Sequence, residues 1–130
     1  MAEEMFDVFV YGSLKAGLQN NYLLADSEFI GCDQTKDKYL MFSLGWFPGV
    51  IKKRKEHHIG GELYRVDKKT LELLDYLEGN GSFYQRELVE LAGHNNKAWM
   101  YLIMDDVDET PSFDNESDIV IYNSCAKWIG

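Results

Sequence analysis

Hydrophobic residues near the start of the chain form a continuous run, Val8-Phe9-Val10-Tyr11, which leads directly into Gly12. Because β-branched and aromatic side chains favour extended structure, the run predicts a largely buried strand over about residues 6–11. Glycine adopts backbone conformations closed to other residues, so the amides that follow are free to point the same way. Such a row of N–H groups suits a carboxylate or a developing oxyanion. A simple turn is the other interpretation of this strand end.

A second pattern, with leucines three residues apart, predicts a helix. Asp67 is a good N-cap residue, and Leu71, Leu74 and Leu77 then fall on one side of the helix, which we expect to face the core. Gly79 is expected to end the helix as a left-handed C-cap.

The remaining patterns predict mainly strands separated by turns. Gly60-Gly61 indicates a bulge or a close approach of two backbones, and the stretch from Gly93 to Asn96 predicts a hairpin turn. Residues 22–24 open a short helix, and residues 119–129 close the fold as a strand or a helix. The strands are expected at about residues 38–42, 50–51, 59–66, 85–91 and 98–104. The fold class expected is α+β, with a small, mixed, barrel-like sheet and a few short helices.

Size and charge restrict the function further. The 130 residues predict a single domain, 1–130, and the formal net charge of −9 argues against nucleic acid as the main partner. The basic run from Lys52 to Lys55 lacks interleaved aromatic residues and is expected to be a solvated loop. We expect no secretory signal, no membrane span and a cytoplasmic location, with Cys32 and Cys125 as free thiols.

Glu78 is the most unusually placed acidic residue. It falls in the last turn of the predicted helix, where unpaired carbonyls make the potential negative, and it lies beside the apolar side of that helix. Both effects disfavour the carboxylate, so we expect a pKa raised toward neutrality, as a general acid–base needs. The alternatives are a surface glutamate or a pair with Arg86, which is also able to bridge to another carboxylate. Asp75, Glu62 and Glu87 are rival acids.

No metal site is expected. His57 and His58 are neighbours on a strand and point to opposite faces, and His94 lies in a predicted turn.

Four segments together resemble the γ-glutamylcyclotransferase-like proteins, in particular the γ-glutamylamine cyclotransferase branch. These segments follow the family's order and are Val8 to Lys15, Gly61 to Val66, Leu73 to Gly79 and Tyr84 to Arg86. The match weakens after Met104, since family members often end with a Gly-Asp/Asn-Trp-like segment where this chain has Tyr122 to Trp128.

The resemblance implies a small barrel-like α+β fold and catalysis without a metal or cofactor. It also implies that the loop of Tyr11, Gly12, Ser13 and Leu14 holds the γ-glutamyl group, and that Glu78 is the catalytic glutamate.

The reaction expected from these residues is cleavage of a small-molecule γ-glutamyl amide by internal attack. The substrate's own α-amino nitrogen closes a five-membered lactam, releasing 5-oxoproline and a free amine without a Ser or Cys nucleophile. Glu78 would move the proton, and the loop amides would hold the α-carboxylate or the oxyanion. Tyr84 and Phe47 are candidates for pocket walls that exclude water, or else are ordinary core or rim aromatics.

Two other functions fit the sequence. One is a non-catalytic module that binds a peptide or metabolite in the same pocket, and the other is cyclotransfer on a γ-glutamyl amino acid or glutathione. The sequence leaves the oligomeric state open.

Overall fold

The computed structural model describes residues 4–12, 14–15, 20–44, 47–81, 83–104 and 119–129. Its first elements are β1 (Met5–Val10), η1, a 3₁₀ helix (Asn21–Leu24), β2 (Glu28–Gln34), β3 (Leu40–Ser43) and β4 (Pro48–Ile51). They are followed by β5 (His58–Asp67), α1 (Lys68–Glu78), β6 (Tyr84–Val89), β7 (Ala98–Ile103), β8 (Ile119–Tyr122) and β9 (Cys125–Trp128).

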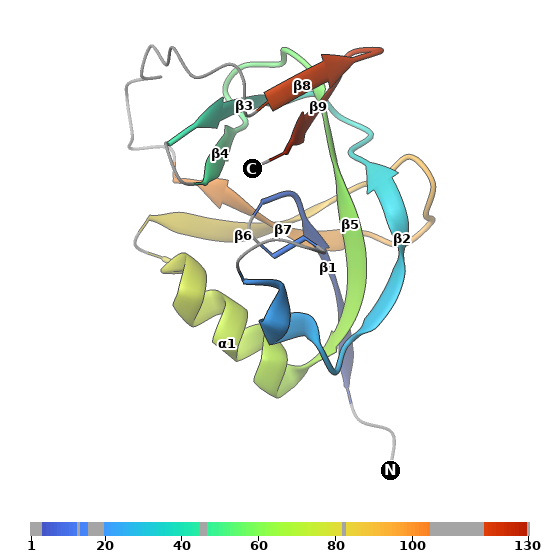
Figure 1. Ribbon diagram of the computed structural model, residues 1–130, viewed down its shortest axis with the longest axis vertical. Coiled ribbons are helices and arrows are strands. Elements are labelled where there is room, and N and C mark those ends of the chain that lie inside the picture. Colours follow the sequence, from blue (N-terminus) through green and yellow to red (C-terminus); the bar gives the residue numbers. More distant parts are fainter. Residues whose placement is uncertain are drawn as a thin grey trace.

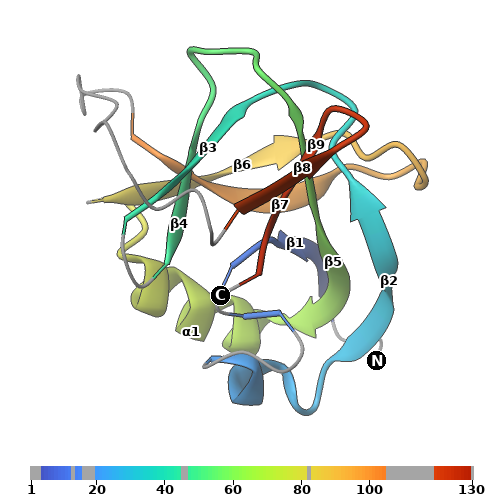
Figure 2. The ribbon, with the colours of Figure 1, turned by 45° about the horizontal axis from the view of Figure 1, so that its top comes forward.

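A curled mixed sheet forms the body of the molecule, and β5 is its central strand (Figure 1). The sheet has the order β6-β7-β1-β5-β9-β8, and β2 pairs with β5 as well. β1 runs parallel to β7, β5 runs parallel to β9, and the other pairs are antiparallel. The β3–β4 hairpin lies across from β2 (Figure 2). This is the mixed α+β architecture expected from the sequence.

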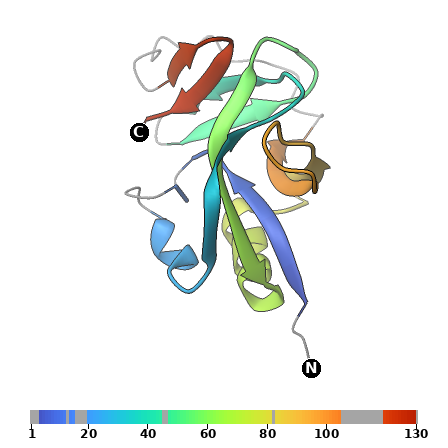
Figure 3. The same cartoon turned by 90° about the vertical axis from the view of Figure 1, so that its right-hand side faces the viewer.

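The second half of β1 is buried on both faces, which explains its continuous hydrophobic run. Val8 and Val10 pack in a cluster with residues of α1, whereas Phe9 and Tyr11 pack in a second cluster with β3, β4 and β9. Since side chains alternate along a strand, each face of β1 supplies one cluster. Figure 3 shows α1 and η1 at one end of the molecule and the β3–β4 and β8–β9 hairpins at the other.

α1 begins and ends where the sequence predicts. The Asp67 carboxylate accepts a hydrogen bond from the backbone N–H three residues on, and Gly79 has a left-handed φ of 59°. Leu71 and Leu74 are buried, as expected. The expectation that Leu77 also faces the core is wrong, because its side chain lies on the pocket described below and is 40% exposed. No helix among the described residues has the length and apolar character needed to cross a membrane.

Three segments differ from, or sharpen, the sequence expectations. β2 was not predicted, because its residues are mostly half-exposed and its ladder with β5 is interrupted by a bulge between Phe29 and Gly31. Residues 119–129 form the two strands of a hairpin. β6 and β7 pair as predicted, but a longer loop, 90–97, joins them, and Asp33 accepts a hydrogen bond from the backbone N–H of Gly93 in this loop. The acidic stretch 105–118 lies outside the described residues.

A close approach of two backbones fixes β5 against the end of β1. A Cβ atom added at Gly61 would lie 2.3 Å from the carbonyl oxygen of Val10. Of the two sequence interpretations of Gly60-Gly61, close approach is therefore the one observed at Gly61.

The Gly61→Ala substitution should destabilise the protein by about 2 kcal/mol or more, because a backbone carbonyl cannot rotate away from the added methyl group and the strands must separate. Urea unfolding of both proteins measures this difference. A change below about 0.5 kcal/mol would show that the two strands can part at little cost.

Candidate active site

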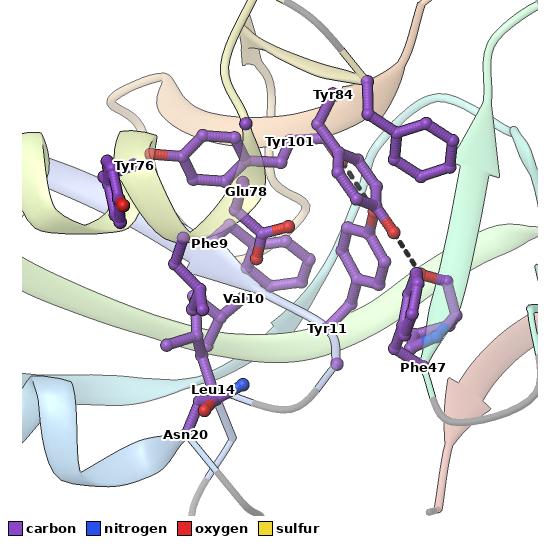
Figure 4. A pocket seen from close by; sticks show the side chains of 15 residues that line it. Phe9, Val10, Tyr11, Leu14, Asn20, Phe47, Tyr76, Glu78, Tyr84 and Tyr101 are labelled. Carbon is purple, nitrogen blue, oxygen red and sulfur yellow. Dashed lines mark hydrogen bonds between the residues drawn. The ribbon is translucent and has the colours of Figure 1, made fainter.

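A pocket of about 440 Å³ opens where β1 ends. Its lining comes from the end of β1 with the turn after it, the C-terminal end of α1, and the pair of β6 and β7. The start of β4 and Asn20 complete the described lining. Figure 4 shows the Glu78 side chain pointing into the pocket, with the rings of Tyr11, Tyr84 and Tyr101 around it.

The structure brings together the site residues that the sequence singled out. Tyr11, Gly12, Leu14, Glu78 and Tyr84 all line this pocket, as does the wall candidate Phe47. The remaining loop residue, Ser13, lies outside the described residues. Sequence reasoning missed Tyr101, which lies in a strand of otherwise apolar appearance.

Glu78 is held in a water-poor environment. Burial raises its pKa from 4.5 to about 7, in the direction expected from its position at the helix end. Loss of solvent is the cause, and no cation among the described residues pairs with the carboxylate. At neutral pH the group is therefore divided between its acid and base forms, so it can both accept and donate a proton.

The rival acids are engaged in other contacts. Asp75 pairs with Arg86, whose Nε lies 2.8 Å from Oδ1. Glu87 pairs with Lys52 at 3.0 Å, and Glu62 accepts a hydrogen bond from the Tyr64 hydroxyl. Of the two roles weighed for Arg86, bridging to another carboxylate is the one observed.

The Asp75–Arg86 pair belongs to a network that anchors the end of α1. The Tyr101 hydroxyl donates a hydrogen bond to Oδ1 of Asp75 at 2.6 Å, and the Arg86 guanidinium stacks 4.3 Å from the centre of the Trp99 ring. The network links α1 to β6 and β7 one helical turn before Glu78. It therefore holds the helix end, and with it the buried carboxylate, against the sheet.

Hydrogen bonds also fix the tyrosine walls. The Tyr11 hydroxyl donates to the backbone carbonyl of Tyr101 at 2.6 Å, and the Tyr84 hydroxyl donates to the carbonyl of Pro48 at 2.9 Å. Burial, together with the nearby Glu78 charge, raises the pKa of Tyr11 and Tyr84 well above their ordinary value. These phenols therefore stay neutral and act as rigid walls.

The turn after β1 is held in place from two sides. The Lys15 N–H donates to the carbonyl of Gly12 at 3.0 Å, and the Asn21 side-chain amide donates to the carbonyl of Leu14 at 2.9 Å. A Cβ atom at Gly12 would come within 3.0 Å of the Pro48 ring, so only glycine fits there without displacement. The Pro48 ring thus packs directly against the backbone of Gly12.

Lys15 and Arg86 lie close to pocket residues in the sequence, but their side chains contact other parts of the protein. Lys15 donates from Nζ to the backbone carbonyl of Trp128, and Arg86 is paired with Asp75. None of the described lining residues is a lysine or arginine, so Glu78 is the charged side chain of the described lining.

The histidines serve the fold. The ring of His57 accepts a hydrogen bond through Nε2 from the Met41 backbone N–H at 2.9 Å, which ties the β3–β4 hairpin to the segment before β5. Within the described ranges, no group of three or more His, Cys, Asp and Glu side chains is arranged to hold a metal ion.

Comparison with known proteins places the chain in a family. The model of the family described as gamma-glutamyl cyclotransferase, AIG2-like, matches residues 8–120. A Methanocaldococcus jannaschii protein that bears the family's name is 44% identical over 98 residues, covering 72% of this chain and 81% of that protein. Gamma-glutamylaminecyclotransferase C of Danio rerio is 39% identical over 94 residues, covering 65% of this chain and 60% of its own.

A solved structure agrees with this assignment. The crystal structure of an AIG2-like protein from Mus musculus superimposes with a TM-score of 0.67 at 27% identity, covering 76% of this chain and 77% of the mouse chain. The chain therefore belongs to the AIG2-like gamma-glutamyl cyclotransferase family.

Proposed function

We propose that the protein cleaves a γ-glutamyl amide by intramolecular cyclisation, releasing 5-oxoproline and a free amine. The observation that supports this most directly is a buried carboxylate, Glu78, whose pKa of about 7 suits proton transfer in both directions. The adjoining turn, Tyr11 to Leu14, is the one that we expect, from the family resemblance, to hold the γ-glutamyl group. The free thiols of Cys32 and Cys125 fit a reducing cytoplasm, where we expect the protein to work.

In the proposed mechanism, the pocket folds the substrate so that its α-amine meets its own γ-carbonyl carbon. Glu78 takes a proton from the α-ammonium group, and the freed amine forms the new C–N bond of the lactam. Glu78 then passes a proton to the departing nitrogen as the old amide C–N bond breaks. A second proton then passes from the same α-nitrogen through Glu78 to the departing nitrogen. The amine therefore leaves as an ammonium ion, and no water is consumed.

The turn and the tyrosines would supply orientation. Backbone amides of Gly12, Ser13 and Leu14 are suited to the substrate's α-carboxylate or to the oxyanion that forms on the γ-carbonyl, and a lost donor of this kind commonly costs about 100-fold in turnover. Tyr11 and Tyr84 would keep water away and hold the folded conformer, which is how positioning lowers a barrier.

Among γ-glutamyl compounds, we propose an amine rather than an amino acid as the leaving group. In a γ-glutamyl amino acid, a carboxylate of the leaving group lies beside the scissile amide. At a separation of about 5 Å, that charge and an ionised Glu78 carboxylate would repel each other by about 3 kcal/mol for an effective dielectric constant of 20. No lysine or arginine among the described lining residues offsets it. The similarity to a relative named for γ-glutamylamine cyclotransfer supports the same choice.

Replacing the proposed base tests the mechanism. Glu78→Gln should lower kcat by about 100-fold or more while the protein stays folded and still binds a γ-glutamyl amide, because the amide side chain keeps the shape but cannot take a proton. Release of 5-oxoproline and calorimetric binding are the measurements. Glu72→Gln, an exposed glutamate on the same helix, is the matched control and should keep full activity.

Full activity in Glu78→Gln would remove Glu78 from the mechanism. Binding of a γ-glutamyl amide without turnover in the native protein would indicate the non-catalytic binding module instead.

The raised pKa of Glu78 makes two measurable pH dependences. The carboxylate is the active form, so kcat/KM should rise with pH through an apparent pKa of about 7. The free energy of unfolding should change in the opposite direction, because the pKa of Glu78 is higher in the folded state than in the unfolded state. The stability that protonated Glu78 contributes is complete below about pH 4.5 and is lost as the pH rises through 7.

Glu78→Gln should therefore become more stable than the native protein above pH 7, by on the order of 3 kcal/mol. The two proteins should converge near pH 4.5. Thermal unfolding at both pH values measures the difference in stability between the two proteins. The same difference at both pH values would argue against a buried Glu78 that titrates near pH 7.

A further inference from the structure

Four exposed apolar side chains surround the pocket, and we call them the apolar rim. Phe47 precedes β4, Tyr76 and Leu77 lie in the last turn of α1, and Phe83 precedes β6. Their exposed fractions are 38%, 88%, 40% and 39%, whereas the tyrosines of the interior walls are nearly inaccessible. Figure 4 shows Phe47 and Tyr76 on different sides of Glu78.

Single exposed apolar residues are common on protein surfaces and need no explanation. Here, however, three separate segments of the chain bring such residues to one pocket. An apolar surface gathered at a cavity is typical of a ligand-binding site, because a ligand that covers it removes apolar area from water.

The reaction itself assigns this surface to one half of the substrate. The scissile bond must lie at Glu78, so the γ-glutamyl half occupies the buried interior beside the turn. The amine half is the part that departs, and it needs an open route to solvent. It therefore lies against the apolar rim.

On the basis of the proposed function, we propose that the apolar rim binds the amine half and selects γ-glutamyl amides of neutral, apolar or aromatic amines. The rim side chains are three aromatic rings and one leucine, and none of the four carries a charge. Tyr76 and Leu77 immediately precede Glu78 in the chain. Contact with the amine substituent is thus made next to the group that protonates the leaving nitrogen.

A cationic amine is the strongest competitor, since aromatic faces also attract ammonium groups. Leu77 offers no such face, and no rim residue is an acid able to pair with a second ammonium. The acid beside the rim, Glu78, is occupied with the leaving nitrogen in the proposed mechanism. The rim therefore favours the neutral substituent.

Three synthetic substrates separate these cases: γ-glutamyl-phenethylamide, γ-glutamyl-ethylamide and γ-glutamyl-(4-aminobutyl)amide. The phenethylamide should show a kcat/KM about tenfold or more above each of the others, because it alone covers the rim with an apolar group. The difference should reside mainly in KM, since the rim does not touch the reacting atoms.

Matched variants show whether the rim is the cause. Leu77→Ser and Tyr76→Ser should each lower kcat/KM for the phenethylamide several times more than kcat/KM for the ethylamide, and so erase most of the preference. Leu73→Ser, one turn earlier on α1 with a side chain 48% exposed, is the control for Leu77. Tyr22→Ser, 70% exposed in η1, is the control for Tyr76. Both controls should retain the preference.

The outcomes separate this inference from the proposed function on which it rests. Equal turnover of all three amides, or a preference for the aminobutyl compound, overturns the selectivity of the rim and leaves the cyclotransferase function standing. Rim variants that lower all three values equally also overturn it, because that result indicates a structural role. If no amide yields 5-oxoproline, the proposed function itself fails and the inference fails with it.

Discussion

The contact on which the architecture depends is the close approach of β5 to the end of β1. β5 pairs with β1, β2 and β9, so it joins every part of the main sheet except the β6–β7 hairpin, which attaches through β1. A side chain at Gly61 would collide with the Val10 carbonyl, and its absence lets the strands meet directly before the Tyr11–Gly12 turn. The pocket thus begins at a point that the sheet itself holds rigid.

α1 contributes to the site in two chemically different ways. Its buried leucines and the Asp75 network attach it to the sheet, whereas its last turn carries an acid without a counter-charge among the described residues. A paired carboxylate would stabilise the fold but would stay ionised at neutral pH. An unpaired Glu78 lowers the stability of the fold but can exchange a proton at neutral pH. The neighbouring Asp75 network holds the helix end rigid.

Local patterns predicted the elements with strong, short-range signals. The helix is defined by Asp67, the leucine spacing and Gly79, and β1 by its unbroken apolar run, so these elements and the placement of Glu78 followed from the sequence. β2 did not, because its residues are half-exposed and a bulge breaks their alternation. Tyr101 was missed for a related reason: its role comes from hydrogen bonds to residues distant in the chain, and no local pattern records such contacts.

The bond between Lys15 and the Trp128 carbonyl joins the turn after β1 to the C-terminal strand. Lys15, in the turn after β1, is anchored by a main-chain oxygen at the end of β9, which a residue of any type would provide. The position of Lys15 therefore depends on where β9 runs and not on which side chain stands at its end. The side chains of β9 have a separate role, because Ala126 and Trp128 are buried in the core.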